Sequence, residues 1–417
     1  MRFTTLEQWL SWQEHLHPSE IDLGLARVRE VWSRLSQGAF TCPVISVAGT
    51  NGKGSSVAFL QAIYLAAGYH VGTYTSPHLW RYNERICLDG EPVGDAKLCE
   101  AFDAVDQARA EISLTYFEFG TLAALWIFAQ QALDVVILEV GLGGRLDAVN
   151  IVDADIALIT SIALDHQAWL GDNVDNIARE KAGIMRKDHL AVISDPAVPL
   201  SLMQAAQDIG ARFFLAGRDF QYEYTNGQWR WQSGDHTRAG LPAPSLAGRH
   251  QLQNAAGVLM VIDLLKDQLP ISQGQIRSGL LSASLPGRFQ IMQGEVTVIY
   301  DVAHNPAAAE SLAKSMVEFN SGQTVQIVFS ALRDKDLAGI VKPFCHLASA
   351  WYLAPLTAQR AAGIEQIEAV VKSQCPAAQV HRSGHIAQSL LQAKANTKPG
   401  DIILVYGSFY TVAQAGG

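Results

Sequence analysis

Short apolar runs alternate with longer amphipathic stretches along most of the chain, and this pattern predicts alternating strands and helices. Residues 43–48 (PVISVA) predict a buried strand, and residues 55–67 predict the helix that follows it. The same pattern continues as strands at 69–74, 134–140 and 155–161, with helices near 95–110 and 115–132. Strands separated by helices indicate βαβ units and a parallel sheet with both faces covered.

The pattern changes in the second half of the chain. Residues 219–239 are polar and aromatic around Asn226-Gly227, which predicts a hairpin. Residues 250–283 have a helical pattern, and Pro286-Gly287 interrupts it. A second alternation then predicts strands at 296–301, 324–330, 350–354 and 401–405. We therefore expect two α/β domains, residues 1–284 and 285–417.

Composition narrows the class of protein. The 417 residues carry a net charge of −9, which disfavours nucleic acid as a partner. No apolar run is long enough to span a bilayer, so we expect no membrane partner. The five cysteines are scattered and form no CxxC pair, so neither a disulfide framework nor a zinc site is expected. A reducing compartment fits best, and the protein is expected in the cytoplasm.

The strongest chemical signal is the loop Val47–Ser56 (VAGTNGKGSS), which lies between the predicted strand and helix. Glycines and a helix N-terminus in this context predict a phosphate-binding loop, with Lys53 reaching the β and γ phosphates. The general pattern G-x-x-x-x-G-K-[ST] is not met, because its first glycine falls on Val47 and Gly54 follows Lys53. The alternative is a glycine-rich turn with a chance lysine.

A known family has a phosphate loop that departs from the general pattern in a similar way. GTNGKGS resembles the loop of the Mur ligase superfamily, and the chain resembles the bacterial dihydrofolate synthase/folylpolyglutamate synthases within it. The resemblance rests on these segments: IDLGL (21–25), GTNGKGS (49–55), SPH (76–78), LTYFEFGTLAAL (114–125), LEVGLGGRLDA (138–148), TSIALDH (160–166), REKAGI (179–184), PGRFQ (286–290), DVAHNP (301–306), DKDLAG (334–339) and GSF (407–409). It implies an ATP-dependent ligase: a P-loop parallel-sheet ATPase domain that also binds folate, followed by a smaller Rossmann-like ligase domain.

The resemblance implies that Ser76, Glu139 and His166 hold Mg²⁺. All three lie at the C-terminal ends of predicted strands, so they are expected at one edge of the sheet. From the residues alone, Glu139 could equally cap the next loop, His166 could be structural, and Ser76 could belong to a simple turn. The cofactors implied are ATP and Mg²⁺, and a monovalent cation such as K⁺ is a further candidate.

Lys181 lies near the end of a predicted helix, where a solvated lysine in helix ion pairs is the alternative. The resemblance implies that this lysine is carbamylated by CO₂. Because that reaction needs a neutral amine, the pKa of Lys181 should be lowered. The catalytic candidates are Lys53, Lys181, Arg288 and His166.

The resemblance also implies the nucleotide contacts Thr50, Asn51, Gly52, Lys53, Asn254, Arg288 and Asp301. Without it, Arg288 could be a surface residue after a turn, and Asn305-Pro306 could simply begin a helix. ATP held between two domains would couple their closure to exclusion of water. His304 and Ser408 are candidate contacts for the incoming glutamate.

For the acceptor, the resemblance implies contacts from three segments. They are Glu20, Ile21, Asp22, Leu23, Thr115, Tyr116, Phe117, Glu118, Leu146, Asp147 and Ala148. Tyr116 and Phe117 could form an aromatic wall for a flat pterin, although core packing explains either ring alone. Ala26 and Arg333 depart from the residues common in the family.

These expectations combine into one function. The protein would add L-glutamate to dihydropteroate and to reduced folates through an acyl phosphate, acting as a monomer on small molecules. Two alternatives are a folylpolyglutamate synthase only and a P-loop ATP-binding protein without ligase activity. A cell-wall precursor ligase of the superfamily is disfavoured, because Lys53 leaves no room for an N-terminal UDP-sugar domain.

Overall fold

The computed structural model describes residues 1–35, 38, 40–225 and 227–416. The chain folds into two compact units. The first contains residues 1–245 and 251–283, and the second contains residues 246–250 and 284–417. The short segment 246–250 therefore belongs with the second unit, where His250 bonds to Ser311 and Arg249 pairs with Glu318.

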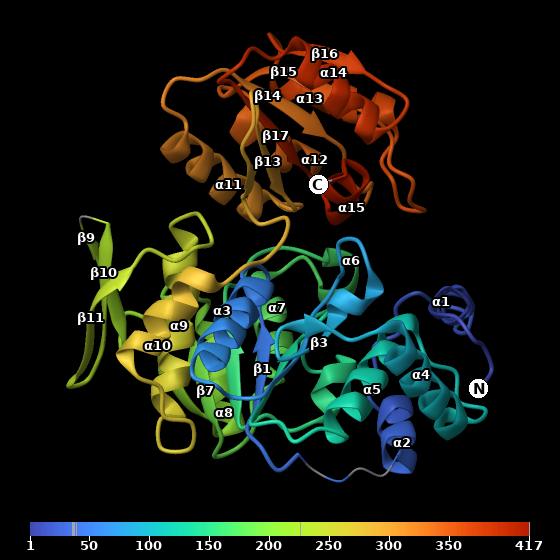
Figure 1. Cartoon of the computed structure of the whole chain (residues 1–417), viewed down its shortest axis with the longest axis vertical. Helices are drawn as coiled ribbons and strands as arrows, with labels where there is room; N and C mark the ends of the chain where they lie inside the picture. The colour runs from blue at the N-terminus through green and yellow to red at the C-terminus, as the bar shows by residue number, and fades with distance from the viewer. Residues whose placement is uncertain (36–37, 39, 226, 417) are drawn as a thin grey trace. The chain divides into compact units, whose positions relative to one another are not determined.

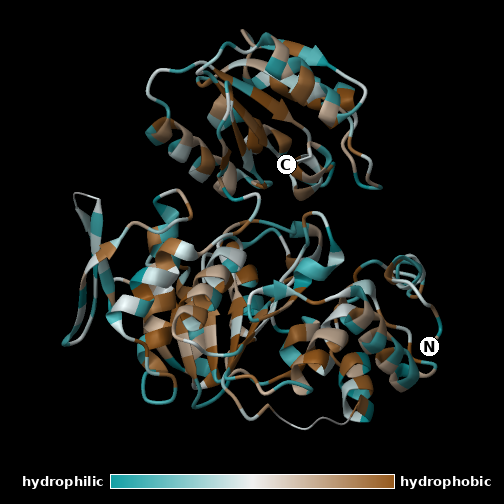
Figure 2. Cartoon of the chain, in the orientation of Figure 1, coloured by the Kyte–Doolittle hydropathy of each residue, from teal (hydrophilic) through white to brown (hydrophobic). Residues whose placement is uncertain are grey.

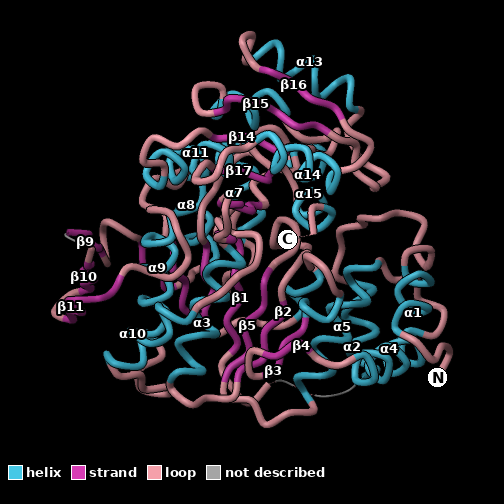
Figure 3. The backbone as a smooth tube through the Cα atoms, turned by 45° about the horizontal axis from the view of Figure 1, so that its top comes forward, coloured by secondary structure: helices cyan, strands magenta, loops and turns pink. Residues whose placement is uncertain are grey.

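The first unit is built on an eight-stranded sheet with the order β4-β3-β2-β5-β1-β6-β7-β8. Figure 3 shows β1, β5 and β2 next to one another in this sheet. Strands β2, β5, β1, β6, β7 and β8 are parallel, and β3 and β4 are antiparallel at one edge. The strands are β1 (Val44–Ala48), β2 (Val71–Tyr74), β3 (Ile86–Leu88), β4 (Glu91–Pro92), β5 (Val135–Glu139), β6 (Ile156–Ile159), β7 (Leu190–Ile193) and β8 (Arg212–Leu215). The central strands are buried along their whole length, as expected for a sheet covered on both faces (Figure 2).

Helices cover this sheet and extend to one side of it (Figure 1). They are α1 (Leu6–Gln13), α2 (Ala26–Leu35), α3 (Lys53–Ala66), α4 (Asp95–Arg109), α5 (Tyr116–Ala129), α6 (Gln167–Leu170), α7 (Val174–Ala182), α8 (Leu200–Ile209), α9 (His250–Leu264) and α10 (Gln273–Ser282), with 3₁₀ turns η1 (Tyr82–Arg85) and η2 (Ala148–Ile151). Helices α1, α2, α4 and α5 form a cluster whose core includes Trp9, Phe102 and Phe119. The helical pattern over 250–283 proves to be two helices, because Pro270 interrupts it and Ser272 caps the second helix.

The expected hairpin is part of a small antiparallel sheet, β11-β10-β9. Its strands are β9 (Gln221–Thr225), β10 (Gln228–Ser233) and β11 (His236–Pro242). Asn226, the first residue of the predicted turn, lies outside the described residues.

The second unit contains a six-stranded sheet with the order β12-β13-β17-β14-β15-β16. All neighbours are parallel except β12 and β13. Its elements are β12 (Gln290–Met292), β13 (Thr297–Asp301), α11 (Pro306–Phe319), β14 (Val325–Phe329), α12 (Leu337–Val341), η3 (Lys342–Phe344), β15 (Ala348–Leu353), α13 (Ile364–Gln374), β16 (Gln379–Arg382), α14 (Ile386–Asn396), β17 (Ile402–Tyr406) and α15 (Phe409–Gln414). The predicted α/β class with parallel sheets is confirmed in both units.

One sequence expectation is wrong. Cys345 and Cys375 form a disulfide, with their Cα atoms 5.1 Å apart. The cysteines follow η3 and α13, elements whose packing brings together positions that are 30 residues apart in the sequence. Spacing alone gave no sign of this pair, because neither cysteine belongs to a local motif. Cys42, Cys87 and Cys99 remain thiols.

Across the residues that the structure describes, every helix is too short or too polar to cross a membrane.

Candidate active site

The phosphate loop lies between β1 and α3, where two glycines allow a close approach of other segments. Gly49 has φ 155°, and a Cβ there would lie 1.8 Å from Oγ1 of Thr160. Gly52 has φ 90°, and a Cβ there would lie 2.4 Å from Oδ1 of Asn254. Both positions require glycine on steric grounds. The contact at Gly52 also places Asn254 against the loop, where the sequence predicted a nucleotide contact.

Two lysines converge on one carbonyl of this loop. Nζ of Lys53 donates to the Gly49 oxygen at 3.0 Å and to the Thr50 oxygen at 3.2 Å, and Nζ of Lys181 donates to the Gly49 oxygen at 2.9 Å. Lys181 is buried, and its burial together with the nearby charge of Lys53 lowers its pKa to about 7. The predicted direction of this pKa shift is confirmed. Two amines this close favour an anion beside the loop.

The phosphate loop is fastened to the loop that follows β6. The Thr50 amide donates to the Ser161 carbonyl at 2.6 Å, and its hydroxyl donates to the Ala163 carbonyl at 3.0 Å. The Asn51 amide donates to Oγ of Ser161 at 3.2 Å. Thr160 and Ser161, which we did not expect from the sequence as site residues, therefore shape the phosphate loop.

The predicted metal ligands lie at or beyond the carboxyl ends of the parallel strands β2, β5 and β6, and Glu139 is the last residue of β5. Because β2 pairs with β5 and β1 pairs with both β5 and β6, the three residues lie at the carboxyl edge of the sheet beside the phosphate loop. The structure brings Ser76 and Glu139 into contact: the Ser76 amide donates to Oε2 of Glu139 at 3.2 Å. Glu139 is 5% exposed, and such a carboxylate favours a cation.

His166 precedes α6 with φ 51°, and its Nε2 lies 3.9 Å from Oδ2 of Asp165. Among the described residues, no group of three or more histidine, cysteine, aspartate or glutamate side chains is arranged to hold a metal. The carboxylate of Glu139 and the hydroxyl of Ser76 offer the oxygen ligands that Mg²⁺ takes together with several waters, whereas the imidazole nitrogen of His166 is an unusual ligand for this ion.

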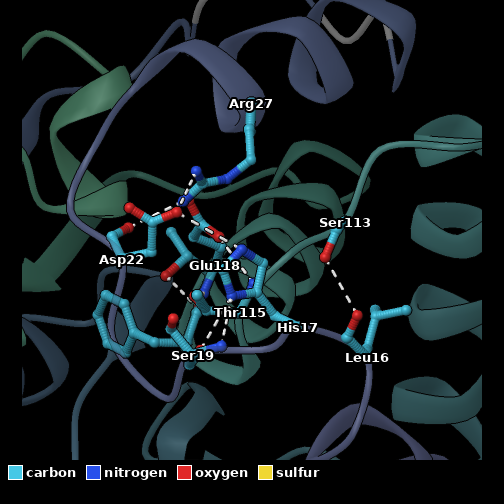
Figure 4. Close-up of polar contacts among 10 residues, drawn as sticks. Leu16, His17, Ser19, Asp22, Arg27, Ser113, Thr115 and Glu118 are labelled. Atoms are coloured by element: carbon cyan, nitrogen blue, oxygen red, sulfur yellow. Dashed lines mark hydrogen bonds and ion pairs between the residues drawn. The ribbon is translucent and has the colours of Figure 1, made fainter.

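Two of the three predicted acceptor segments meet at the start of α5 (Figure 4). Thr115 and Glu118 form a capping box: Oγ1 of Thr115 accepts from the Glu118 amide, and Oε2 of Glu118 accepts from the Thr115 amide. Arg27 joins this helix end to the segment before α2. Its Nη1 donates to Oδ2 of Asp22 at 2.6 Å, and its Nη2 donates to Oε1 of Glu118 at 2.9 Å.

Arg27 was not expected from the sequence, because its partner Glu118 is distant along the chain. The nearest signal was its neighbour Ala26, a departure from the family pattern. His17 also lies at this site, with Nε2 3.5 Å from Oδ2 of Asp22. Glu20 is exposed, and Ile21, Asp22 and Leu23 are half-buried.

The loop that carries the third predicted acceptor segment packs against Phe117 of α5. A Cβ on Gly141 would lie 2.6 Å from the ring of Phe117, so this ring lies on the backbone of the 141–148 loop. Asp147 is buried in that loop and accepts from the amides of Leu142 and Val149 at 2.8 and 3.0 Å. Burial raises its pKa to about 6. Leu146 is half-buried and Ala148 is buried beside it.

The remaining predicted residues gather in the second unit. The guanidinium carbon of Arg288 lies 5.3 Å from the ring centroid of Phe409, and the His304 ring lies 6.2 Å from the same ring. Asp301 is half-buried, desolvation raises the pKa of its carboxyl, and it accepts from the amides of Phe289 and Ala303 at 2.8 Å each. Asp301 thus fixes the backbone next to Arg288.

Ser408 and Asn305 have local structural roles. Ser408 is 3% exposed, and its hydroxyl accepts from the Thr411 amide as the cap of α15. Asn305 caps α11, with Pro306 in the first turn, so the helix-initiating interpretation of Asn305-Pro306 is confirmed.

The chain is similar to known proteins along nearly its whole length. Residues 47–262 match the Mur ligase middle domain, and residues 287–409 match the glutamate ligase domain of Mur ligases. The chain is 44% identical to the dihydrofolate synthase/folylpolyglutamate synthase of Escherichia coli K12 over 98% of this chain and 94% of that protein. It belongs to the Mur ligase family. The protein is therefore a ligase.

Further Mur ligases of the same name are similar along most of the chain. The dihydrofolate synthase/folylpolyglutamate synthase of Bacillus subtilis is 33% identical over 86% of this chain and 87% of its own length. The structure of E. coli FolC in complex with DHPP and ADP superposes with a TM-score of 0.93 at 44% identity, over 99% of this chain and 97% of that chain. Another, of a bifunctional folylpolyglutamate synthase/dihydrofolate synthase with Mn, AMPPNP and L-glutamate bound, has a TM-score of 0.90 at 43% identity, over 99% and 97% of the two chains.

Proposed function

We propose that this protein adds L-glutamate to dihydropteroate, giving dihydrofolate, and to the glutamyl tail of reduced folates. ATP and a divalent metal ion are its cofactors. The observation that carries the proposal is the pair of lysines, Lys53 and Lys181, that converges on Gly49 beside the contact between Ser76 and Glu139. Such a site can hold a nucleoside triphosphate, and the relatives that bind ADP or AMPPNP span nearly the whole chain.

The nucleotide would lie on Thr50, Asn51, Gly52 and Lys53, with Asn254 against the loop. A Mg²⁺ ion held by Ser76, Glu139 and His166 would offset phosphate charge and orient the γ-phosphate. The acceptor carboxylate attacks the γ-phosphorus, the bond to ADP breaks, and an acyl phosphate forms. Lys53 and Arg288 stabilise the charge on the transferring group. The amine of L-glutamate then attacks the acyl carbon, and phosphate leaves.

Lys181 has a further role in this proposal, because a neutral amine can react with CO₂ to give a carbamate. Its buried position and lowered pKa, about 7, support that chemistry. Carbon-13 NMR of the protein in labelled bicarbonate should show a carbamate signal that Lys181→Arg removes. A signal that persists in this variant would exclude Lys181 as the carbamylated residue.

The acceptor would contact the segments 20–23, 115–118 and 146–148. The relative whose structure contains DHPP and ADP supports a pteroate ligand for this chain. We assign nucleotide and folate binding to residues 1–284 and the ligase role to residues 285–417, with His304 and Ser408 near the incoming glutamate. We further propose a cytoplasmic monomer that does not bind nucleic acid, in keeping with its net charge of −9.

The test is phosphate release with MgATP and L-glutamate, with dihydropteroate in one reaction and tetrahydrofolate in another. Release that requires glutamate together with either acceptor is the expected result. Release with tetrahydrofolate alone would reduce the function to folylpolyglutamate synthesis. ATP turnover that ignores both acceptors and glutamate would favour an ATP-binding protein without ligase activity.

A further inference from the structure

Arg85 is a buried arginine whose described neighbours are aromatic rings and a histidine. It is 9% exposed at the end of η1, and its Nε donates to Nδ1 of His78 at 2.8 Å. Within the described part of the chain, no aspartate or glutamate forms an ion pair with its guanidinium. The comparable buried arginine, Arg109, is 8% exposed and pairs with Asp106 at 2.7 Å. Buried arginines are normally paired in this way, and Arg85 departs from that pattern.

Aromatic rings surround the guanidinium of Arg85. Its central carbon lies 5.3 Å from the ring centroid of Tyr82 and 5.5 Å from that of Tyr116. Phenols stay protonated near neutral pH, so these rings contribute cation–π attraction but no negative charge. Nε is used by His78 and the guanidinium also interacts with the Tyr74 hydroxyl, so its remaining N–H groups are the donors left to meet an anion. Among the described residues, the guanidinium therefore has no ion-pair partner to balance its positive charge.

The position of Arg85 suggests which anion it would bind. The Thr75 amide donates to the Arg85 carbonyl at 2.8 Å, so Arg85 lies across the strand pair from the residue before Ser76, a proposed metal ligand. On its other side Arg85 contacts Tyr116, which belongs to the proposed acceptor site. The acceptor must place its reacting carboxylate next to the γ-phosphate, with its pterin further away. This carboxylate is therefore the anion that would meet Arg85.

We propose that Arg85 binds the carboxylate of the acceptor that receives the phosphoryl group. The inference rests on the proposed function and adds a substrate-binding residue to it. A terminal nitrogen of Arg85 donates to one carboxylate oxygen, and the other oxygen attacks the γ-phosphorus. The new O–P bond forms as the bond to ADP breaks, the electron pair leaves with ADP, and Arg85 keeps its protons. The benzoate of a pteroate and the γ-carboxylate of a glutamyl tail present the same chemistry.

The experiment compares two ligands that differ only in this carboxylate. Binding of dihydropteroate and of its decarboxylated analogue is measured by calorimetry with MgADP present. The wild type should bind dihydropteroate about 10- to 100-fold more tightly than the analogue, as expected for a charged hydrogen bond. Arg85→Gln should remove this preference, and its affinity for the analogue should stay within about threefold of the wild-type affinity. The control Arg81→Gln, at an exposed arginine of the same segment that pairs with Asp95, should keep the preference.

The outcomes separate this inference from the proposed function. A wild type that binds neither ligand would overturn the proposed acceptor class and this inference with it. If the wild type prefers dihydropteroate and Arg85→Gln keeps that preference, or weakens both ligands equally, the inference alone is wrong. Should Arg85→Gln fail to fold, Arg85→Lys carries the test. It should lower the preference at least about threefold, and an unchanged preference would overturn the role of the guanidinium.

Discussion

Nη2 of Arg27 donates to Oε1 of Glu118 at 2.9 Å, and this ion pair joins the segment before α2 to the first turn of α5. The Glu118 side chain is 4% exposed, so its buried negative charge is stabilised by Arg27 and by the hydrogen bonds of the capping box with Thr115. Because the same guanidinium also holds Asp22, one residue organises two of the three proposed acceptor segments.

Arg27→Met should therefore lower the free energy of unfolding by about 1–3 kcal/mol, since it leaves the buried Glu118 carboxylate without its cation. Denaturant unfolding measures this change. Adding Glu118→Gln to Arg27→Met should recover part of the loss. The matched control is Arg34→Met, whose pair with Glu30 has side chains 40% and 56% exposed and should contribute less than about 0.5 kcal/mol. Equal losses from Arg27→Met and Arg34→Met would refute this account of the pair.

Gly52→Ala should weaken nucleotide binding about tenfold or more. Gly52 has φ 90°, and the added Cβ would meet Oδ1 of Asn254 at 2.4 Å, so the phosphate loop must shift. Titration with MgADP measures the effect. Gly94→Ala is the control, because Gly94 has φ −70° and nothing within 4 Å of its added Cβ. Unchanged ADP affinity in Gly52→Ala would mean that this loop does not bind the nucleotide.

Burial of Lys181 should make stability depend on pH. Its pKa falls from 10.5 in the unfolded chain to about 7 in the folded protein. Between these values the unfolded chain binds a proton that the folded chain does not, so stability decreases as the pH falls from 10.5 to about 7 and is then constant. Lys181→Met removes this contribution and should be more stable than the wild type at pH 7, with an advantage that shrinks towards pH 9. Urea unfolding in CO₂-free buffer at both pH values measures it, and an advantage independent of pH would contradict the lowered pKa.

Glu139→Gln should raise the Mg²⁺ concentration needed for ATP turnover by more than about tenfold, because an amide replaces the buried carboxylate. Turnover measured against Mg²⁺ concentration gives this value, and excess chelator should abolish turnover in the wild type. Glu91→Gln, at an exposed glutamate of the edge strand β4, should leave the Mg²⁺ dependence unchanged. A similar shift in both variants would argue against a metal at Glu139.

The sequence predicted those parts of the molecule that depend on local pattern. The buried strands β1, β5 and β6 are continuous apolar runs, and Glu139 lies at the end of one of them. Strands β3, β4, β7, β8, β12 and β16 were not predicted. Strands β12 and β16 are short and partly exposed, so no apolar run marks them, whereas β7 is an apolar run that was missed.

Contacts between distant segments could not be predicted from the sequence. Arg27 acquires its role from Glu118, and Arg85 acquires its position from the pairing of β2 with β3. Thr160 was missed for the same reason, because it meets Gly49 only in the folded sheet. The Cys345–Cys375 disulfide likewise depends on the packing of the elements that carry the cysteines.

The most direct test of the central claim follows the oxygen atoms of the acceptor. Dihydropteroate labelled with ¹⁸O in its carboxylate is incubated with the protein, MgATP and L-glutamate, and the released phosphate is analysed by mass spectrometry. An acyl phosphate predicts that each phosphate carries one labelled oxygen, because the carboxylate oxygen that attacks the γ-phosphorus leaves with it. Dihydrofolate formed together with unlabelled phosphate would contradict the account.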